Sequence, residues 1–273
     1  MKDFINKYLN KKILNYLKKI IPNERNAILK KLEFKNFKNI IYLGSDYGGW
    51  SLLDDFSLNE KYIISAGLGE DASFDIEMIN KYNCKVIIID PTPRAIEHYN
   101  QIIKNSGKQK ITEYTENGKQ NISSYELTSI NNSNFILVKN ALYNTDNKEL
   151  KFFSPPNKNH VSHSLNNWQN NYELNSEFIL VKTITVKSIL EKFNIKHLEL
   201  IKLDIEGSEV EVIKNMFESN IFPKQILIEF DELNKFSKIS LDRFFNIHNK
   251  ILSYGYKIIK TDSEFPNFLY IKF

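Results

Sequence analysis

Four carboxylates lie close together in the segment IKLDIEGSEVEVIKNM, which begins at Ile201. Two of them, Asp204 and Glu206, follow an apolar run that predicts a buried strand. In an extended chain, residues two apart project to the same side. Open α/β sheets bind ligands outside the carboxyl ends of their strands, where a carboxylate can act as a general base. We therefore expect Asp204 and Glu206 to be catalytic residues.

The remaining two carboxylates have a structural explanation. Ser208 and Glu211 fit an S-x-x-E capping box, in which each side chain binds a free backbone N–H at a helix start. Glu209 would lie in the first turn of that helix, where the helix dipole favours an anion. Gly207 permits the sharp turn between strand and helix.

A second candidate site is the segment IISAGLGEDASFD, where Gly67 and Gly69 fall between a predicted strand and a predicted helix. Without a Cβ, these residues let the chain turn sharply and let a ligand approach the backbone. The next predicted strand ends at Asp90, about twenty residues further on, where a carboxylate can bind both hydroxyls of a ribose. This pattern predicts a nucleoside-bearing cofactor.

Two classes of cofactor fit this spacing. Gly67, Gly69 and Ala72 also satisfy the dinucleotide fingerprint of NAD(P)-dependent oxidoreductases, which place a pyrophosphate at the helix N-terminus. Glu70 and Asp71 would repel that pyrophosphate, whereas they favour the ammonium and sulfonium groups of S-adenosylmethionine. The acidic loop thus favours S-adenosylmethionine, with Glu70 as the better ligand because Asp71 can also serve as a helix N-cap.

The surrounding elements predict a doubly wound α/β sheet, because short apolar strands alternate with amphipathic helices from residue 62 onwards. We expect strands at 61–67, 85–90, 134–143, 198–204 and 225–230, and helices at 73–82, 93–105, 188–194, 208–219 and 241–255. Added β elements are expected at 148–155 and 178–186 around a polar loop, and an antiparallel hairpin at 256–273.

Two loops carry further candidates. YLGSDYGGW, from Tyr42 to Trp50, has adjacent glycines before an aromatic residue, which suits either a mobile loop that closes over a site or a plain surface turn. HVSHSL contains His160 and His163, and histidine titrates near neutral pH. We expect His163 to be an alternative proton acceptor, with a purely structural role as the competing interpretation.

The N-terminal part of the chain is basic. Residues 1–40 hold eleven Lys/Arg against three Asp/Glu, so a net charge of +4 for all 273 residues leaves −4 on the remainder. Apolar residues at helical spacing over 5–20 predict an amphipathic helix, followed by a short helix over 24–33. We expect a basic helical extension at 1–38, which contacts an anionic membrane, its own domain or a partner in a homodimer, and a catalytic domain at 39–273.

Composition narrows the class of protein. The chain contains three arginines, which supply few bidentate contacts to phosphates or guanines, so nucleic-acid binding is not expected. No apolar stretch reaches the roughly 18 residues of a membrane span, and no signal peptide is expected. A single cysteine, Cys84, excludes an intrachain disulfide and fits a reducing compartment. We expect a cytoplasmic enzyme.

The chain resembles FkbM-type methyltransferases over roughly residues 40 to 273. Six segments occur in the family's order: GLGEDASFD, IIIDPTPRAI, ALYNTDNKELKFF, HVSHSL, IKLDIEGSEVEVIKNM and ILIEF. The K-x-D-x-E-G-x-E string is the most specific. The resemblance implies a class I methyltransferase (Rossmann-like) sheet of seven strands with the last antiparallel. It also implies S-adenosylmethionine as cofactor and O-methylation of a sugar, a glycan precursor or a related small metabolite.

The resemblance also implies site residues, by position. Gly67 and Gly69 would line the methionine part and Asp204 would lie near the methyl group. The ribose and adenine would be contacted by Asp90, Pro91, Thr92, Asn140 and Ala141. Ser65 stands where the family commonly has an acid, and Asp71 where it has a third glycine. The methionine ammonium would then depend on Glu70 or Asp204.

Methyl transfer to oxygen requires the hydroxyl, the methyl group and the sulfur to be held in line, and a base to take the hydroxyl proton. We expect Asp204 to be that base, with Glu206 or His163 as alternates. No metal is expected, although Asp204 and Glu206 can hold a divalent ion. Two alternatives stay open: an NAD(P)-dependent Rossmann oxidoreductase, and a catalytically silent protein that binds S-adenosylmethionine.

Overall fold

The computed structural model describes residues 24–273 except 158–162, 168–169 and 235. The chain divides into two compact units, residues 1–34 and 35–273. The first is described only from Glu24 and contains helix α3 (Glu24–Leu29). The predicted helix over 5–20 lies outside the described residues, as does His160.

A seven-stranded sheet forms the centre of the second unit, in the order β11-β12-β10-β9-β3-β4-β5. β12 runs antiparallel to both of its neighbours, β10 and β11, and the other neighbouring strands are parallel, which confirms the predicted methyltransferase sheet and the C-terminal hairpin. The strands are β3 (Tyr62–Ala66), β4 (Lys85–Ile89), β5 (Phe135–Val138), β9 (Leu200–Leu203), β10 (Gln225–Glu229), β11 (Tyr256–Ile259) and β12 (Asn267–Lys272). Their apolar side chains are almost completely buried and form much of the core.

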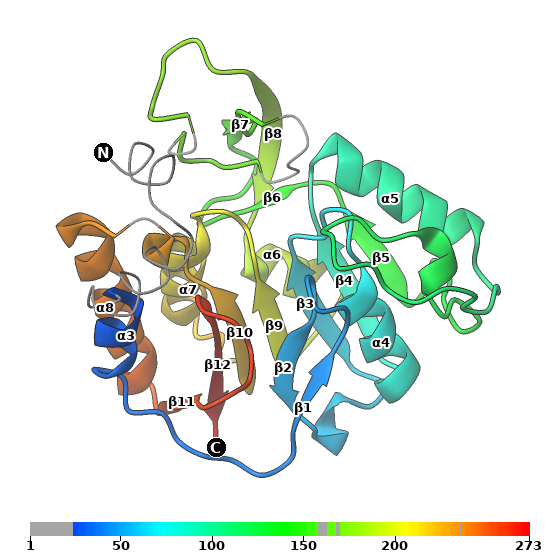
Figure 1. Cartoon of the computed structure of the whole chain (residues 1–273), viewed down its shortest axis with the longest axis horizontal. Coiled ribbons are helices and arrows are strands. Elements are labelled where there is room, and N and C mark those ends of the chain that lie inside the picture. The colour runs from blue at the N-terminus through cyan, green and yellow to red at the C-terminus, as the bar shows by residue number, and fades with distance from the viewer. Residues whose placement is uncertain (1–23, 158–162, 168–169, 235) are drawn as a thin grey trace, which may run out of the picture. The chain divides into compact units, whose positions relative to one another are not determined.

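Five helices accompany this sheet among the described residues of the second unit: α4 (Ser73–Tyr82), α5 (Pro93–Lys104), α6 (Val186–Lys192), α7 (Glu209–Glu218) and α8 (Lys238–Ser253). From β3 and β9 the sheet grows in opposite directions, so right-handed crossovers place α4 and α5 on one face and α7 and α8 on the other. Figure 1 shows these two groups at opposite sides of the sheet. The carboxyl ends of the neighbouring strands β3 and β9 therefore mark the switch point at which such sheets bind ligands.

A two-stranded antiparallel ribbon, β1 (Ile40–Leu43) with β2 (Trp50–Leu53), precedes the central sheet. Strand β2 packs against β10 and β12, and β1 packs against α4. The buried side chain of Gln225 accepts from the Leu53 N–H (2.8 Å) and donates to its carbonyl (3.0 Å). The sequence predicted only a loop here, because the two strands are short and their glycine-rich connection dominates the pattern.

A second small sheet consists of β6 (Ala141–Leu142), β7 (Glu149–Phe153) and β8 (Phe178–Ile184) in the order β6-β8-β7 (Figure 1). The single strand predicted over 134–143 is therefore wrong. The chain leaves the central sheet after Val138 and joins the small sheet at Ala141. The side chains of Ala141, Phe152 and Val181 form a small apolar cluster of their own.

Three short 3-10 turns complete the described elements: η1 (Phe56–Leu58), η2 (Ile122–Ser124) and η3 (Asp231–Leu233). None of the helices in the described part of the chain has both the length and the apolar character needed to cross a bilayer.

Candidate active site

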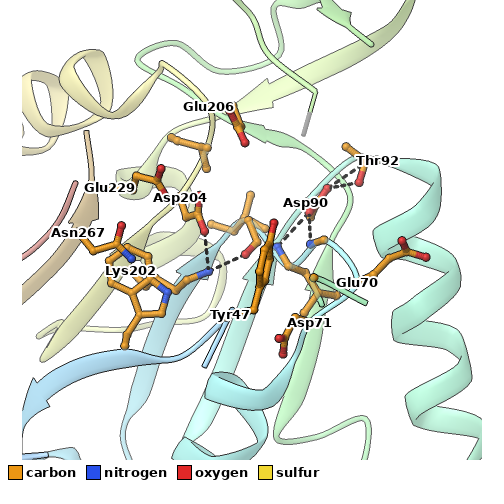
Figure 2. A pocket seen from close by; sticks show the side chains of 18 of the residues that line it. Tyr47, Glu70, Asp71, Asp90, Thr92, Lys202, Asp204, Glu206, Glu229 and Asn267 are labelled. Carbon is orange, nitrogen blue, oxygen red and sulfur yellow. Dashed lines mark hydrogen bonds and ion pairs between the residues drawn. The ribbon is translucent and has the colours of Figure 1, made fainter. Parts of the chain in front are cut away.

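A cavity of about 410 Å³ opens at the carboxyl ends of β3, β4, β9 and β10. This volume lies within the range of roughly 300–1,000 Å³ that is usual for small-molecule sites. The turn between β1 and β2 forms one wall, and the small sheet with described residues of the segment between β7 and β8 forms another. Figure 2 shows side chains of residues that line this space.

The ends of β3 and β9 touch at Gly67. Its φ is +86°, and a Cβ at this position would lie 1.8 Å from the carbonyl oxygen of Asp204. Only glycine fits such a close approach at a positive φ. The tight turn brings the backbone of residues 67–69 to the floor of the cavity, as the glycine pattern predicted.

Asp90 holds this turn in place from the end of β4. One carboxylate oxygen accepts from the N–H groups of Leu68 (3.0 Å) and Gly69 (3.1 Å). The other accepts from the N–H (2.8 Å) and the hydroxyl (2.7 Å) of Thr92. Asp90 is nearly buried and lines the cavity together with Pro91 and Thr92. Its carboxylate therefore has a clear structural role in addition to any contact with a ligand.

Glu70 also lines the cavity, but its carboxylate is paired with Arg94 and, at 3.1 Å, with Lys119. These two cations offset the negative charge of the Glu70 carboxylate, which was expected to bind the ammonium group of the cofactor. The surface-exposed Lys119 contributes less to this balance than Arg94, which approaches more closely. Glu70 is therefore a weaker candidate for a cationic ligand than its sequence suggested.

Asp71, the other acid of this loop, is held by protein groups. Its carboxylate accepts from the Ser45 hydroxyl (2.5 Å), the Gln120 amide (3.1 Å) and the Ser73 N–H (2.9 Å). The last bond satisfies a free N–H at the start of α4, although Ala72 is the N-cap residue. Asp71 thus fixes the β1–β2 turn onto the helix start.

Lys202, near the end of β9, lies beneath the glycine turn and was not among the predicted site residues. It is only 4% exposed, and its ammonium donates to the Gly67 carbonyl at 2.7 Å. The ammonium lies 3.8 Å from a carboxylate oxygen of Asp204 and 5.6 Å from the centre of the Trp50 ring. Figure 2 shows Lys202 between the glycine turn and Asp204.

Three carboxylates face the cavity from the ends of β9 and β10: Asp204, Glu206 and Glu229. Burial raises the pKa of Glu229 to about 8, and the charges of Asp204 and Glu206 add to this rise. The pKa of Asp204 is also raised, first by burial and then by Asp90, while Lys202 opposes the shift. The side chain of Asp204 keeps 37% of its accessibility, because it opens into the cavity. This cluster can exchange protons near neutral pH.

The turn between β9 and α7 differs from the prediction. Ser208 makes no capping bond, and Glu211 pairs with Arg243 (3.2 Å) instead of closing a capping box. The buried carboxylate of Glu209 accepts from the N–H groups of Ile205 (2.8 Å) and Gly207 (2.9 Å). The expected capping box is therefore wrong: Glu211 is drawn to Arg243, and Glu209 binds backbone N–H groups of the turn before the helix.

Glu206 reaches the cavity by a different route from the one expected. Its φ is +58°, so the chain is not extended beyond Leu203 and the same-side argument does not hold. The Glu206 carbonyl accepts from the Ser164 hydroxyl at 2.6 Å, which ties the insertion to this turn. His163 lines the same wall, with its ring nitrogen 3.2 Å from the Ser154 hydroxyl.

Two predicted cofactor contacts lie outside the cavity lining. Ser65 is fully buried within β3. Asn140 lies in the link between β5 and β6, where its amide donates to the Lys182 carbonyl at 3.1 Å. Ala141, by contrast, does line the cavity.

Tyr47 and Trp50 line the cavity and belong to the loop named as a candidate from the sequence, whereas Lys202, Glu229 and Asn267 were missed. Glu229 is the penultimate residue of the predicted strand QILIEF and the last of β10, so the rule that ligands bind at strand ends could have identified it. Lys202 belongs to the quoted K-x-D-x-E-G-x-E string. A buried lysine inside an apolar strand is itself a signal. Among the described residues, no group of three or more His, Cys, Asp or Glu side chains is arranged to hold a metal ion.

The strand order, the antiparallel β12 and the cavity at the β3–β9 switch point define a Rossmann-like methyltransferase fold. Residues 62–258 match the family model described as "Methyltransferase FkbM domain", which covers more than half of the chain. The chain belongs to this FkbM family of methyltransferases. Searches among curated proteins and among solved structures gave no match.

Proposed function

We propose that the protein transfers the methyl group of S-adenosylmethionine to a hydroxyl of a sugar, a glycan precursor or a related small metabolite. The observation that supports it best is the charge of the cavity. Eight carboxylates line it, and Lys202 is the only lysine or arginine among the described lining residues. Arg94 and Lys119 offset the charge of Glu70. Glu229, with a pKa of about 8, is largely protonated at neutral pH, and the remaining carboxylates leave the lining with a net negative charge. Such a lining attracts a ligand with a net positive charge and repels phosphates.

The NAD(P) alternative is disfavoured by the start of α4. The Ala72 N–H donates to the Tyr125 hydroxyl at 3.0 Å, and the Ser73 N–H donates to Asp71 at 2.9 Å. A dinucleotide pyrophosphate needs free N–H groups at this helix N-terminus. Both of these donors already have protein partners, and one partner is an anion.

The residues of the cavity fit S-adenosylmethionine in their chemistry. Gly67 and Asp204 would hold the methionine end, and Asp90 would bind the ribose. Of the four donors on Asp90, the Thr92 hydroxyl can rotate away, so a ribose hydroxyl can take its place. When bound, S-adenosylmethionine supplies an electrophilic methyl group on a positively charged sulfur.

The carboxylates at the ends of β9 and β10 provide the base that hydroxyl methylation requires. Asp204, Glu206 and Glu229 face the cavity from one side, and the pKa of Glu229, about 8, suits proton uptake near neutral pH. Most of the rate acceleration would come from holding the hydroxyl in line with the methyl group. The protein walls position the acceptor, while the carboxylates accept its proton.

Calorimetric titration of S-adenosylmethionine, S-adenosylhomocysteine and NADH tests the cofactor. We expect micromolar binding of the first two to the wild type and to the control Asp262→Ala, whose carboxylate is exposed and outside the cavity lining. Binding to Asp90→Ala should be at least tenfold weaker, because the glycine turn loses its anchor. Binding of NADH alone would overturn the proposal.

Transfer of a labelled methyl group tests the acceptor class. Neutral sugars, oligosaccharides and other hydroxyl-bearing metabolites would be incubated with protein and labelled S-adenosylmethionine, and the products analysed for O-methyl groups. Tight cofactor binding without transfer to any of these acceptors would favour the catalytically silent alternative.

A further inference from the structure

Lys202 carries a positive charge in a cavity whose other ionisable lining residues are mostly acidic. The described lining contains no other lysine or arginine, and its carboxylates are Asp46, Glu70, Asp71, Asp90, Asp204, Glu206, Glu229 and Glu264. Any carboxylate of a ligand is repelled by most of this surface. Lys202 is the place where such a group meets a favourable charge.

The hydrogen bonds of Lys202 are incomplete. An ammonium has three N–H donors, and the Gly67 carbonyl accepts one of them at 2.7 Å. The contact with Asp204, at 3.8 Å, is an ion pair that is too long for a hydrogen bond. The remaining donors have no hydrogen-bond partner among the described residues, and the Trp50 ring at 5.6 Å supplies only a cation–π contact. A buried ammonium in this state is stabilised by an added acceptor.

We propose that Lys202 binds the carboxylate at the methionine end of S-adenosylmethionine, an inference that rests on the proposed function. Lys202 and Asp204 form a cation and an anion side by side on the floor of the cavity. An α-amino acid presents the opposite pair, a carboxylate beside an ammonium. The two pairs are complementary, so Lys202 binds the carboxylate while Asp204 faces the ammonium. This pairing selects ligands with an intact amino-acid end.

Two ligands that differ only in the carboxylate test the proposal: S-adenosylmethionine and decarboxylated S-adenosylmethionine. Each would be titrated calorimetrically into the wild type, Lys202→Met and Lys182→Met. Methionine keeps the length of the side chain but removes its charge. Lys182 is an exposed lysine of β8 outside the cavity lining, so its variant is the matched control.

The wild type and Lys182→Met should bind S-adenosylmethionine on the order of tenfold to a hundredfold more tightly than the decarboxylated ligand. In Lys202→Met this ratio should fall to about one, because only the carboxylate loses its partner. Loss of charge beside Asp204 affects both ligands alike, so the ratio isolates the carboxylate contact.

Three results would overturn the proposal. The first is an equal loss of affinity for both ligands in Lys202→Met, which would indicate that the lysine has a purely structural role. The second is a wild type that binds the two ligands with the same affinity, a result that stands even if the variant does not fold. The third is absence of binding of either ligand to the wild type, which would remove the proposed function itself.

Discussion

Carboxyl groups of one cavity have different tasks because their surroundings differ. Asp90 is held by four protein donors and shapes the glycine turn. Glu229 makes one long contact with the Asn234 amide, at 3.3 Å, and faces the charges of Asp204 and Glu206. Burial and these neighbours disfavour its ionised form, so Glu229 readily binds a proton. It is therefore the group best suited to take up the proton of a substrate hydroxyl.

The pH dependence of methyl transfer should reflect the titration of Glu229. A base works only when ionised, so with a pKa of about 8 the transfer rate should fall about tenfold per pH unit below that value. Glu229→Gln should lower kcat by about a hundredfold or more and abolish this acid limb. The measurement is the pH profile of kcat, with the acceptor identified by the labelled-methyl assay.

The matched control is Glu264→Gln, which removes the same charge from another part of the cavity lining. Its profile should keep the acid limb of the wild type. An unchanged acid limb in Glu229→Gln would show that another group, such as Asp204, takes the proton.

At the scale of elements, the site depends on two strand ends that touch. Gly67 at the end of β3 lies against the carbonyl of Asp204, which directly follows β9. Lys202 joins the same two strand ends by its bond to the Gly67 carbonyl. The ribbon β1–β2 and the small sheet then close the cavity from either side. The central sheet thus positions the carboxylates and Lys202, and the ribbon and the small sheet form walls of the cavity.

A methyl group at Gly67 should separate these strand ends. Gly67→Ala should lower the free energy of unfolding by about 1–3 kcal/mol more than Gly107→Ala, and should also weaken S-adenosylmethionine binding. Gly107 is the matched control because its φ is +83°, close to that of Gly67, yet nothing lies within 4 Å of its added Cβ. Urea unfolding and calorimetry measure the two effects. Equal destabilisation by the two variants would show that backbone conformation alone, and not the contact with Asp204, requires glycine.

At the scale of the whole molecule, basic and acidic residues are unevenly distributed along the chain. The net charge is +4, but the basic excess lies in residues 1–40, and the chain beyond them is acidic. The cavity concentrates this acidity at one end of the sheet. A field of this kind favours positively charged ligands and is reduced by salt.

Salt should therefore weaken the binding of S-adenosylmethionine more than the binding of S-adenosylhomocysteine, because the latter lacks the sulfonium charge. Between about 0.05 M and about 0.5 M sodium chloride, we expect the dissociation constant of S-adenosylmethionine to rise several-fold relative to that of S-adenosylhomocysteine. Parallel calorimetric titrations measure the ratio. A ratio that does not change with salt would mean that the net charge of the cavity does not contribute to cofactor preference.

Local patterns in the sequence were enough to predict the order of the central elements. Strand runs such as KVIIID and helical runs such as SFDIEMINKY carry their period and their end signals within a few residues. The positions of Asp90 and Asp204 followed from the same rule, because parallel strands end at one edge of the sheet. The glycine turn, the β9 end and the family were accordingly predictable from the chain alone.

Contacts between distant segments decided the rest. Glu70 is paired with Arg94 and Lys119. Glu211 is paired with Arg243 instead of closing the expected capping box. Spacing along the chain does not reveal these partners. The charge on Glu229 depends in the same way on neighbours brought together by folding. The sequence by itself determined the order of the central strands and helices and the positions of Asp90 and Asp204 directly after two of those strands. The tertiary structure decided which of those acids are already paired, because electrostatic interactions depend on distance in space and on burial.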